Sequence, residues 1–232
     1  MLKRVVVTGI GALTPIGLDV SSFWDGLMSS VSGAAPITRF DSSKFKTHFA
    51  CELKNFKAED HIDRKELRKL DDFSVYALVS TEEAIKDANL NLESLNLQRC
   101  GVIWGSGIGG LKTMSSEIES YVLNDKIPRF SPFFIPKMIS DIAAGLLSIK
   151  YGFKGANFST VSACASSTNS IIEAYHYIKL GKSDIMISGG SEASVNEAAL
   201  GGFNSLRALS TRNEDPQKAS RPFDLNRDGF VL

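Results

Sequence analysis

Short segments rich in β-branched residues alternate with longer segments of helical periodicity along this chain of 232 residues. A short, apolar, β-prone segment predicts a buried strand, and strands that are separated by helices pair in parallel within a layered sheet. The expected strands cover residues 4–8, 102–104, 158–161 and 185–188. The alternation therefore predicts an α/β fold. Because no Pro- or Ser-rich linker interrupts it, we expect residues 1–232 to form one domain.

The helical segments carry start and stop signals. Asp19 or Ser21 can cap a helix whose apolar positions run from Phe23 to Val31 and which ends near Gly33. Further helices are expected where apolar residues recur at helical spacing, namely over residues 63–89, 112–123, 136–151 and from just after residue 164 to 180. The polar, broken segment 36–60 predicts an irregular excursion with a short hairpin.

Composition narrows the class of protein. Hydrophobic residues make up 43%, charged residues 22%, and the formal net charge is +0, so nothing global points to nucleic acid or to a membrane surface. No apolar run reaches the roughly 18 residues of a membrane span, and the first residues lead into a strand rather than a signal peptide. The odd set Cys51, Cys100 and Cys164 predicts neither disulfides nor a zinc site, and a reducing cytoplasm is expected.

Cys164 is the candidate catalytic residue. It follows the predicted strand 158–161 and precedes a predicted helix. A thiol at that point faces the unpaired N–H groups and the positive end of the helix dipole, which favour thiolate over thiol. The small neighbours Ala163, Ala165 and Ser166 leave room for a substrate carbonyl. The alternative is a small buried core residue, as most free cysteines are.

Two glycine clusters follow predicted strands. Gly9-Ile10-Gly11 begins like a dinucleotide-binding fingerprint, but the sixth position is Thr14 and the next acidic residue after the following helix, Asp41, comes too late. A tight turn is the simpler interpretation. The cluster at 105–110 lacks the Lys-Ser/Thr of a phosphate-binding loop, and its bulky Ile108, taken alone, is a buried anchor.

Several motifs, in order, resemble one enzyme family. Residues 162–167, Ser-Ala-Cys-Ala-Ser-Ser, resemble the nucleophile motif of the β-ketoacyl-acyl-carrier-protein synthases, the condensing enzymes of fatty acid synthesis. Other segments are similar to the elongating synthase II branch of that family, and the likeness runs from residue 3 to residue 232. These segments cover residues 4–11, 105–111, 131–136, 208–213, 220–224 and 227–232.

The resemblance implies a thiolase-like layered fold with a mixed sheet and helices on both faces, of which this chain is the first half. It also implies an acyltransferase in which Cys164 takes an acyl group from acyl carrier protein and a decarboxylative Claisen condensation with malonyl-acyl-carrier protein follows. Ile108, Phe133 and Phe203 then line the acyl pocket, with Phe133 reaching the partner subunit of a homodimer. No metal or other cofactor is implied.

The resemblance also gives a role to the basic residues. Carrier proteins are acidic, so Lys65, Arg68, Lys69 and Arg207 are expected to form a basic rim that binds the carrier and its phosphopantetheine arm. The alternative for such a charge run is an ordinary solvated face.

One departure from the family pattern concerns completeness. The family uses two histidines, a lysine and a glycine-rich loop that lie in its second half, and His48, His61 and His176 match none of these positions. We therefore expect a truncated chain that is inactive in condensation by itself. Two other interpretations stay open, a non-catalytic chain-length-factor-like subunit and a relative of thiolase or of the coenzyme-A-primed synthase III. Cys164 argues against the first, and the motifs at 105–111 and 131–136 argue against the second.

Overall fold

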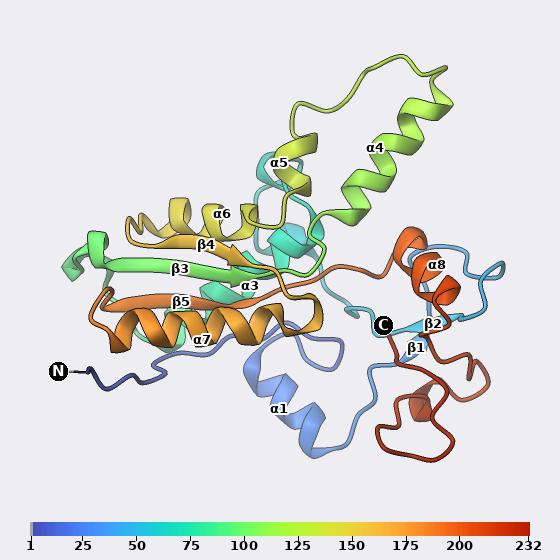
Figure 1. Cartoon of the computed structure of the whole chain (residues 1–232), viewed down its shortest axis with the longest axis horizontal. Coiled ribbons are helices and arrows are strands. Elements are labelled where there is room, and N and C mark those ends of the chain that lie inside the picture. The colour runs from blue at the N-terminus through green and yellow to red at the C-terminus, as the bar shows by residue number, and fades with distance from the viewer. Residues whose placement is uncertain (1) are drawn as a thin grey trace. The chain divides into compact units, whose positions relative to one another are not determined.

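The computed structural model describes residues 2–232, which form two compact units (Figure 1). The first unit consists of the residues up to Gly11 together with Lys57–Ala193. The second consists of Ala12–Phe56 and Ser194–Leu232. The expectation of one truncated domain over residues 1–232 stays a prediction.

The first unit is built on a parallel three-stranded sheet. Its strands are β3 (Cys100–Gly105), β4 (Asn157–Thr160) and β5 (Ile185–Gly190), in the order β4-β3-β5. Every residue of the central strand β3 is buried, and its last residue, Gly105, pairs with Thr160 on one side and with Gly190 on the other. The expectation of parallel strands is therefore confirmed for three of the four predicted segments.

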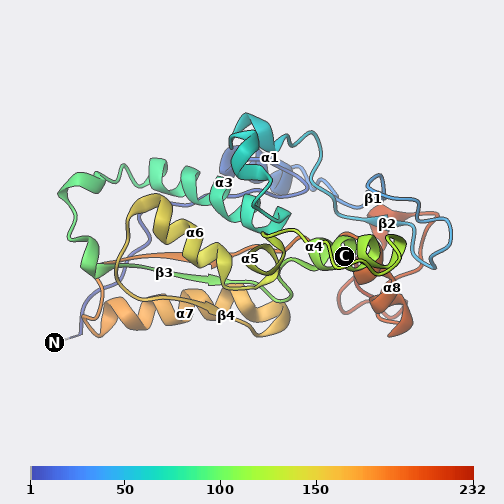
Figure 2. The ribbon, with the colours of Figure 1, turned by 90° about the horizontal axis from the view of Figure 1, so that it is seen from above.

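Helices cover both faces of this sheet. Figure 2 shows α6 (Ile142–Tyr151) and α7 (Ser166–Lys179) on opposite sides of β3. Helix α3 (Asp72–Asp87) packs against α6. The side chains between these elements are fully buried, and the largest of them are Phe73, Ile103 and Leu147. This layering matches the predicted α/β architecture.

The predicted first strand is wrong. Residues 4–8 are not part of any sheet, and Val6 and Val7 are 56% and 79% exposed. A strand needs hydrogen bonds to the backbone of a neighbour, and among the described residues no strand pairs with this segment. The glycines after it serve close packing, because a Cβ on Gly9 would lie 2.1 Å from the carbonyl oxygen of Ala84 in α3.

Two helices expected to be continuous are each broken. The pattern at 63–89 forms α2 (Arg64–Leu67) and α3, because the Asp71 side chain caps α3 and starts a new helix. The pattern at 136–151 forms α5 (Phe134–Met138) and α6, with Ile139 in an extended conformation between them. The predicted helix at 112–123 is α4 (Leu111–Leu123), as expected.

The second unit contains α1 (Val20–Met28), α8 (Glu197–Ser205) and the antiparallel pair β1 (Ala35–Pro36) and β2 (Phe49–Ala50). The expected hairpin in 36–60 is thus confirmed, and the predicted N-cap of α1 is Asp19. A small core gathers Ala34, Phe49 and Ala219. Short 3₁₀ turns complete the two units, at Ala58–Asp60, Leu92–Ser94, Leu97–Arg99, Ala163–Ala165 and Pro216–Lys218. None of the helices in the described part of the chain is long and apolar enough to cross a membrane.

Candidate active site

Cys164 lies where the sequence places it, between a strand end and a helix start. Strand β4 ends at Thr160, and α7 begins at Ser166. The thiol is exposed within the 3₁₀ turn Ala163–Ala165, and Ala163 has a left-handed φ of 52°. A non-glycine residue in that conformation requires support from its surroundings.

Ser166 supplies that support. Its Oγ accepts a hydrogen bond from the Ser162 N–H at 2.9 Å and donates one to the Ala163 carbonyl at 2.7 Å. The Thr160 hydroxyl donates to the Ser166 carbonyl at 2.8 Å. Ser166 is 3% exposed, so these bonds are protected from water. Sequence reasoning gave Ser166 only a role as a small neighbour, although a serine at a helix start is a known signal for such local bonds.

Two glycines bring α7 against the ends of the sheet strands. A Cβ on Gly105, the last residue of β3, would lie 2.4 Å from the carbonyl carbon of Ser166. A Cβ on Gly190, the last residue of β5, would lie 2.7 Å from the Cβ of Ser167. Since neither approach tolerates a side chain, both glycines are required for the helix that follows Cys164 to reach the sheet.

The loop that carries Ile108 lies beside the turn that carries Cys164. A Cβ on Gly107 would lie 3.2 Å from the carbonyl oxygen of Ala163. Gly109 has a φ of 78°, and the Ile108 side chain is 42% exposed. Ile108 is therefore not the buried anchor that the sequence alone suggested. The two loops are neighbours although Ile108 and Cys164 are 56 positions apart in the sequence.

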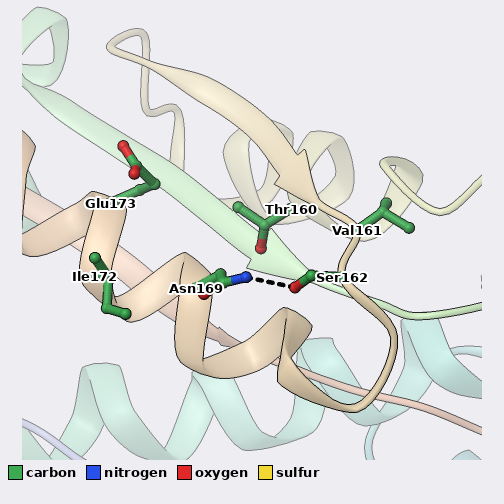
Figure 3. Close-up of a pocket in the computed structure, with 6 residues that line it drawn as sticks. All are labelled: Thr160, Val161, Ser162, Asn169, Ile172 and Glu173. Atoms are coloured by element: carbon green, nitrogen blue, oxygen red, sulfur yellow. Dashed lines mark hydrogen bonds between the residues drawn. The ribbon is translucent and has the colours of Figure 1, made fainter.

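A shallow depression of about 430 Å³ lies on one side of this turn (Figure 3). In it the Asn169 side chain, from α7, points at Ser162 and donates a hydrogen bond to its Oγ at 2.6 Å. The depression is lined by Thr160, Val161, Ser162, Asn169, Ile172 and Glu173. Because neither Cys164 nor any predicted acyl-binding residue lines it, this depression is not the predicted acyl tunnel, which stays a prediction.

The two predicted pocket phenylalanines have different surroundings. Phe133 precedes α5 and is 37% exposed, and its N–H donates to the Ser131 hydroxyl at 3.2 Å. Phe203 belongs to α8 in the second unit and packs edge to face on Phe230, with ring centroids 5.2 Å apart. Their role in acyl binding stays a prediction.

The basic residues of the expected carrier surface are all exposed. Lys65 lies in α2 and Arg68 follows it, while Arg207 follows α8 in the second unit. Lys69 forms an ion pair with Glu66 at 2.7 Å, which neutralises part of its charge locally. The role of these residues in carrier binding stays a prediction.

The other thiols differ from Cys164 in their surroundings. Burial raises the pKa of the Cys51 thiol, and burial together with the nearby Asp184 carboxylate raises that of Cys100. Cys100 is fully buried in β3, Cys51 is half-buried, and Cys164 is exposed. His48, His61 and His176 are all exposed.

Residues 2–232 match the family described as "Beta-ketoacyl synthase, N-terminal domain". The chain belongs to this β-ketoacyl synthase family. It is 51% identical over 231 residues to the 3-oxoacyl-[acyl-carrier-protein] synthase 2 of Staphylococcus aureus (strain COL), covering 99% of this chain and 55% of that relative. The chain therefore spans about half the length of the curated relatives it matches.

Solved β-ketoacyl synthases share the fold. A β-ketoacyl synthase from Burkholderia phymatum STM815 superposes with a TM-score of 0.85 at 30% identity, covering 99% of this chain and 56% of that one. The chain also superposes on a chain of a solved complex, with a TM-score of 0.78 at 25% identity, covering 90% of this chain and 58% of that one. That complex is described as a type II polyketide synthase acyl-carrier protein with its ketosynthase, bound to the hexaketide. The thiolase-like fold that the motifs predicted is thereby confirmed, as is the match to the first half of the family.

Proposed function

We propose that this chain supplies the nucleophile-bearing half of a 3-oxoacyl-[acyl-carrier-protein] synthase, an acyltransferase of type II fatty acid synthesis. The observation that carries the proposal is the exposed Cys164 thiol, held on a supported turn between β4 and α7 in a chain of the β-ketoacyl synthase family. A thiol there is open to a bulky thioester, whereas a core cysteine is not.

The proposed reaction has two stages. The Cys164 sulfur attacks the acyl thioester carbonyl, a new C–S bond forms, and the carrier leaves as its thiol, which takes the proton. Malonyl-acyl-carrier protein then loses carbon dioxide, and the resulting enolate carbon attacks the acyl carbon, so that the C–S bond to Cys164 breaks. The histidines that assist decarboxylation are, by resemblance, outside residues 1–232.

Three residues are proposed to shape the acyl pocket. The Ile108 loop adjoins the Cys164 turn, which supports Ile108 as a gate beside the thioester. Phe133 is exposed directly before α5, a helix that packs against α4 (Figure 1), which suits a side chain that reaches a second subunit. Phe203 is assigned to the pocket on the resemblance alone.

The proposed partners are acyl carrier protein and a second copy of the chain. An acidic carrier suits the exposed Lys65 and Arg68. The contribution of Lys69 is smaller because Lys69 pairs with Glu66, and Arg207 contributes from the second unit. A homodimer suits the apolar side chains that α4 exposes, including Met114, Ile118 and Val122. The proposed location is the cytoplasm, because a reducing compartment suits the three unpaired thiols.

Mass spectrometry of the intact protein that carries this chain tests the function. Incubation with acyl-acyl-carrier protein is expected to add one acyl group at Cys164, and subsequent malonyl-acyl-carrier protein is expected to remove it as a 3-oxoacyl product. The Cys164→Ala variant should take up no acyl group, while Cys51→Ala serves as the matched control. Stable acylation at another residue, or none at all in the unmodified protein, would refute the proposal.

A further inference from the structure

Glu192 holds the loop that carries Ile108. Its Oε2 accepts hydrogen bonds from two successive backbone N–H groups, Gly107 at 2.8 Å and Ile108 at 3.0 Å. The next N–H, that of Gly109, donates to the Ser106 hydroxyl at 3.1 Å. Three consecutive backbone N–H groups of the glycine-rich loop thus donate hydrogen bonds to side-chain oxygens.

Successive N–H groups that converge in this way form a concave site for an anion, and here a carboxylate of the same chain fills it. Hydrogen bonds to an ionised acceptor are stronger than those between neutral groups. A loop rich in glycine has many conformations of similar energy. The two hydrogen bonds to Glu192 favour the observed conformation over the others.

The backbone next to Glu192 is itself fixed. The Ser191 N–H donates to the Gly105 carbonyl at 3.1 Å, directly after the register pair of Gly190 with Gly105. The Ser191 hydroxyl accepts from the Trp104 ring N–H at 2.9 Å and donates to the Phe73 carbonyl at 2.7 Å. Glu192 therefore extends from the end of β5 at a defined place relative to the end of β3.

The same loop is in contact with the nucleophile turn. Gly107 lies between the two, since a Cβ on it would be 3.0 Å from Glu192 Oε2 and 3.2 Å from the Ala163 carbonyl oxygen. If the Glu192 contact is lost, the backbone at Gly107 and Ile108 can therefore shift, and Gly107 is in contact with the turn that carries Cys164.

We infer that Glu192 is a positioning residue that fixes Ile108 beside Cys164 and thereby sets which acyl chain lengths load onto the thiol. This inference rests on the proposed function, because it assigns the selectivity of the same acyl-transfer step. Glu192 does not touch the reacting atoms; it acts through the Gly107 and Ile108 amides.

Two variants in the intact protein that carries this chain separate the hydrogen bond from a general structural effect. Glu192→Ala removes the acceptor, and Glu192→Gln keeps an acceptor oxygen while losing the charge. Glu93→Ala, which removes another exposed carboxylate, is the matched control. The melting temperature of each variant shows that it is folded before any other measurement is compared.

The first readout is hydrogen exchange of the peptide that covers residues 105–111. Glu192→Ala should speed exchange of the Gly107 and Ile108 amides about tenfold. Glu192→Gln should speed it clearly less, because the acceptor oxygen stays and only the charge is lost, and Glu93→Ala should have no effect. Unchanged exchange in Glu192→Ala, or equal loosening in both Glu192 variants, would overturn the assignment. This readout does not depend on any enzymatic activity.

The second readout is the rate at which octanoyl and palmitoyl thioesters of N-acetylcysteamine acylate Cys164. Glu192→Ala should change the ratio of the two rates about threefold or more, because the gate loses its fixed position, while iodoacetamide should alkylate the thiol at an unchanged rate. Faster exchange with an unchanged ratio would overturn the selectivity role. If the unmodified protein is not acylated at all, the proposed function fails, and the exchange measurement alone decides whether Glu192 holds the loop.

Discussion

At the scale of single residues, the site depends on short polar contacts around two backbone turns. Ser166 bonds to both sides of the left-handed Ala163, and Glu192 bonds to the loop that touches it. In the proposed function their bonds keep Cys164 and Ile108 in one arrangement, which matters because the geometry of the proposed acyl transfer tolerates little displacement.

Cys164 should be the most reactive of the three thiols toward an alkylating reagent. The exposed position of Cys164 allows attack, whereas burial raises the pKa values of Cys51 and Cys100 and lowers their thiolate fractions. Limited iodoacetamide treatment followed by peptide mapping should show at least about tenfold faster labelling at Cys164. Preferential labelling of either other cysteine in folded protein would contradict this prediction, and urea-unfolded protein, in which the three should label alike, is the control.

Ser166→Ala should destabilise the protein by about 1–3 kcal/mol and slow acylation of Cys164. The loss leaves the Ser162 N–H without its acceptor and removes the side-chain hydrogen bond to the Ala163 carbonyl, which keeps only the one from the Ser166 backbone N–H. The left-handed Ala163 thereby loses part of its support. Urea unfolding and thioester acylation rates measure the two effects. Ser116→Ala, which removes an exposed hydroxyl bonded within α4, is the matched control and should have almost no effect. Equal behaviour of the two variants would show that Ser166 does not hold the turn.

At the scale of elements, side chains join helices that the sequence pattern leaves unrelated. Asp71 caps α3 and also accepts a hydrogen bond from the Thr113 N–H at 3.0 Å, so that the starts of α3 and α4 are connected. Glu82 in α3 accepts from Lys150 in α6 at 2.9 Å and from Lys86 one turn along at 2.8 Å. These contacts fix the layer of helices over the sheet.

Glu82 should contribute a pH-dependent part of the stability. The hydrogen bonds from Lys150 and Lys86 lower its pKa to about 2, from an ordinary value of 4.5. The folded-state pKa is depressed, so the contribution is complete above the unfolded pKa of about 4.5 and is lost as the pH falls toward about 2. Glu82→Gln should cost under about 1 kcal/mol at pH 7, since the group is partly exposed to solvent.

Urea unfolding at pH 7, 4 and 2.5 measures this contribution. The difference between unmodified protein and Glu82→Gln should shrink steadily as the pH falls. Glu93→Gln, at an exposed carboxylate in the 3₁₀ turn Leu92–Ser94, should show no such trend. A difference that stays constant down to pH 2.5 would mean that the ion pairs do not stabilise the fold.

Helix α2 should contribute to carrier binding through its exposed charges. Lys65→Glu and Arg68→Glu should each weaken binding of an acidic carrier protein about threefold to tenfold at low salt, and less at high salt, because screening reduces the attraction. Lys69→Glu should have a smaller effect, since Glu66 already pairs with Lys69. Arg207→Glu tests the second unit in the same way.

Titration of the carrier at two ionic strengths is the measurement. Lys154→Glu is the control, because Lys154 precedes β4 whereas Cys164 follows it, at the opposite end of that strand. If reversal of Lys65, Arg68 and Arg207 all left the affinity unchanged, these residues would be an ordinary solvated face.

At the scale of the whole molecule, much apolar surface is exposed. Helix α7 exposes Ile171 and Ile172, and α4 exposes Val122 and Leu123, the last at 75%. Large apolar side chains that a helix leaves exposed are candidate contacts for other protein. Among the described residues, the extended segment at 4–8 likewise has no neighbouring strand.

Residues 1–232 expressed alone should not condense acyl and malonyl carriers and should self-associate. They contain the proposed nucleophile but no histidine matching the family's catalytic positions. Their exposed apolar helix side chains can pack against those of a second copy. Size-exclusion chromatography and a condensation assay, with and without a separately expressed second half from a full-length relative, measure both properties. A monomer with full condensing activity by itself would contradict the prediction.

The sequence by itself determined the elements whose signals are local. The parallel strands β3, β4 and β5 and the position of Cys164 between β4 and α7 follow from short-range periodicity and motif order. Capping residues limited the cap of α1 to Asp19 or Ser21, and the structure uses Asp19. The breaks before α3 and α6 were missed because each half of the pattern keeps helical spacing, so only the cap at Asp71 and the extended Ile139 reveal them.

Only the tertiary structure decided which distant residues meet. Glu192 contacts the Ile108 loop because β5 and β3 pair in register and end at the same edge of the sheet. Residues 4–8 have strong strand propensity but pair with no strand among the described residues, and propensity alone does not make a strand. Local physics therefore fixed the individual elements and the place of the thiol, while pairing across the sheet fixed the loops that surround it.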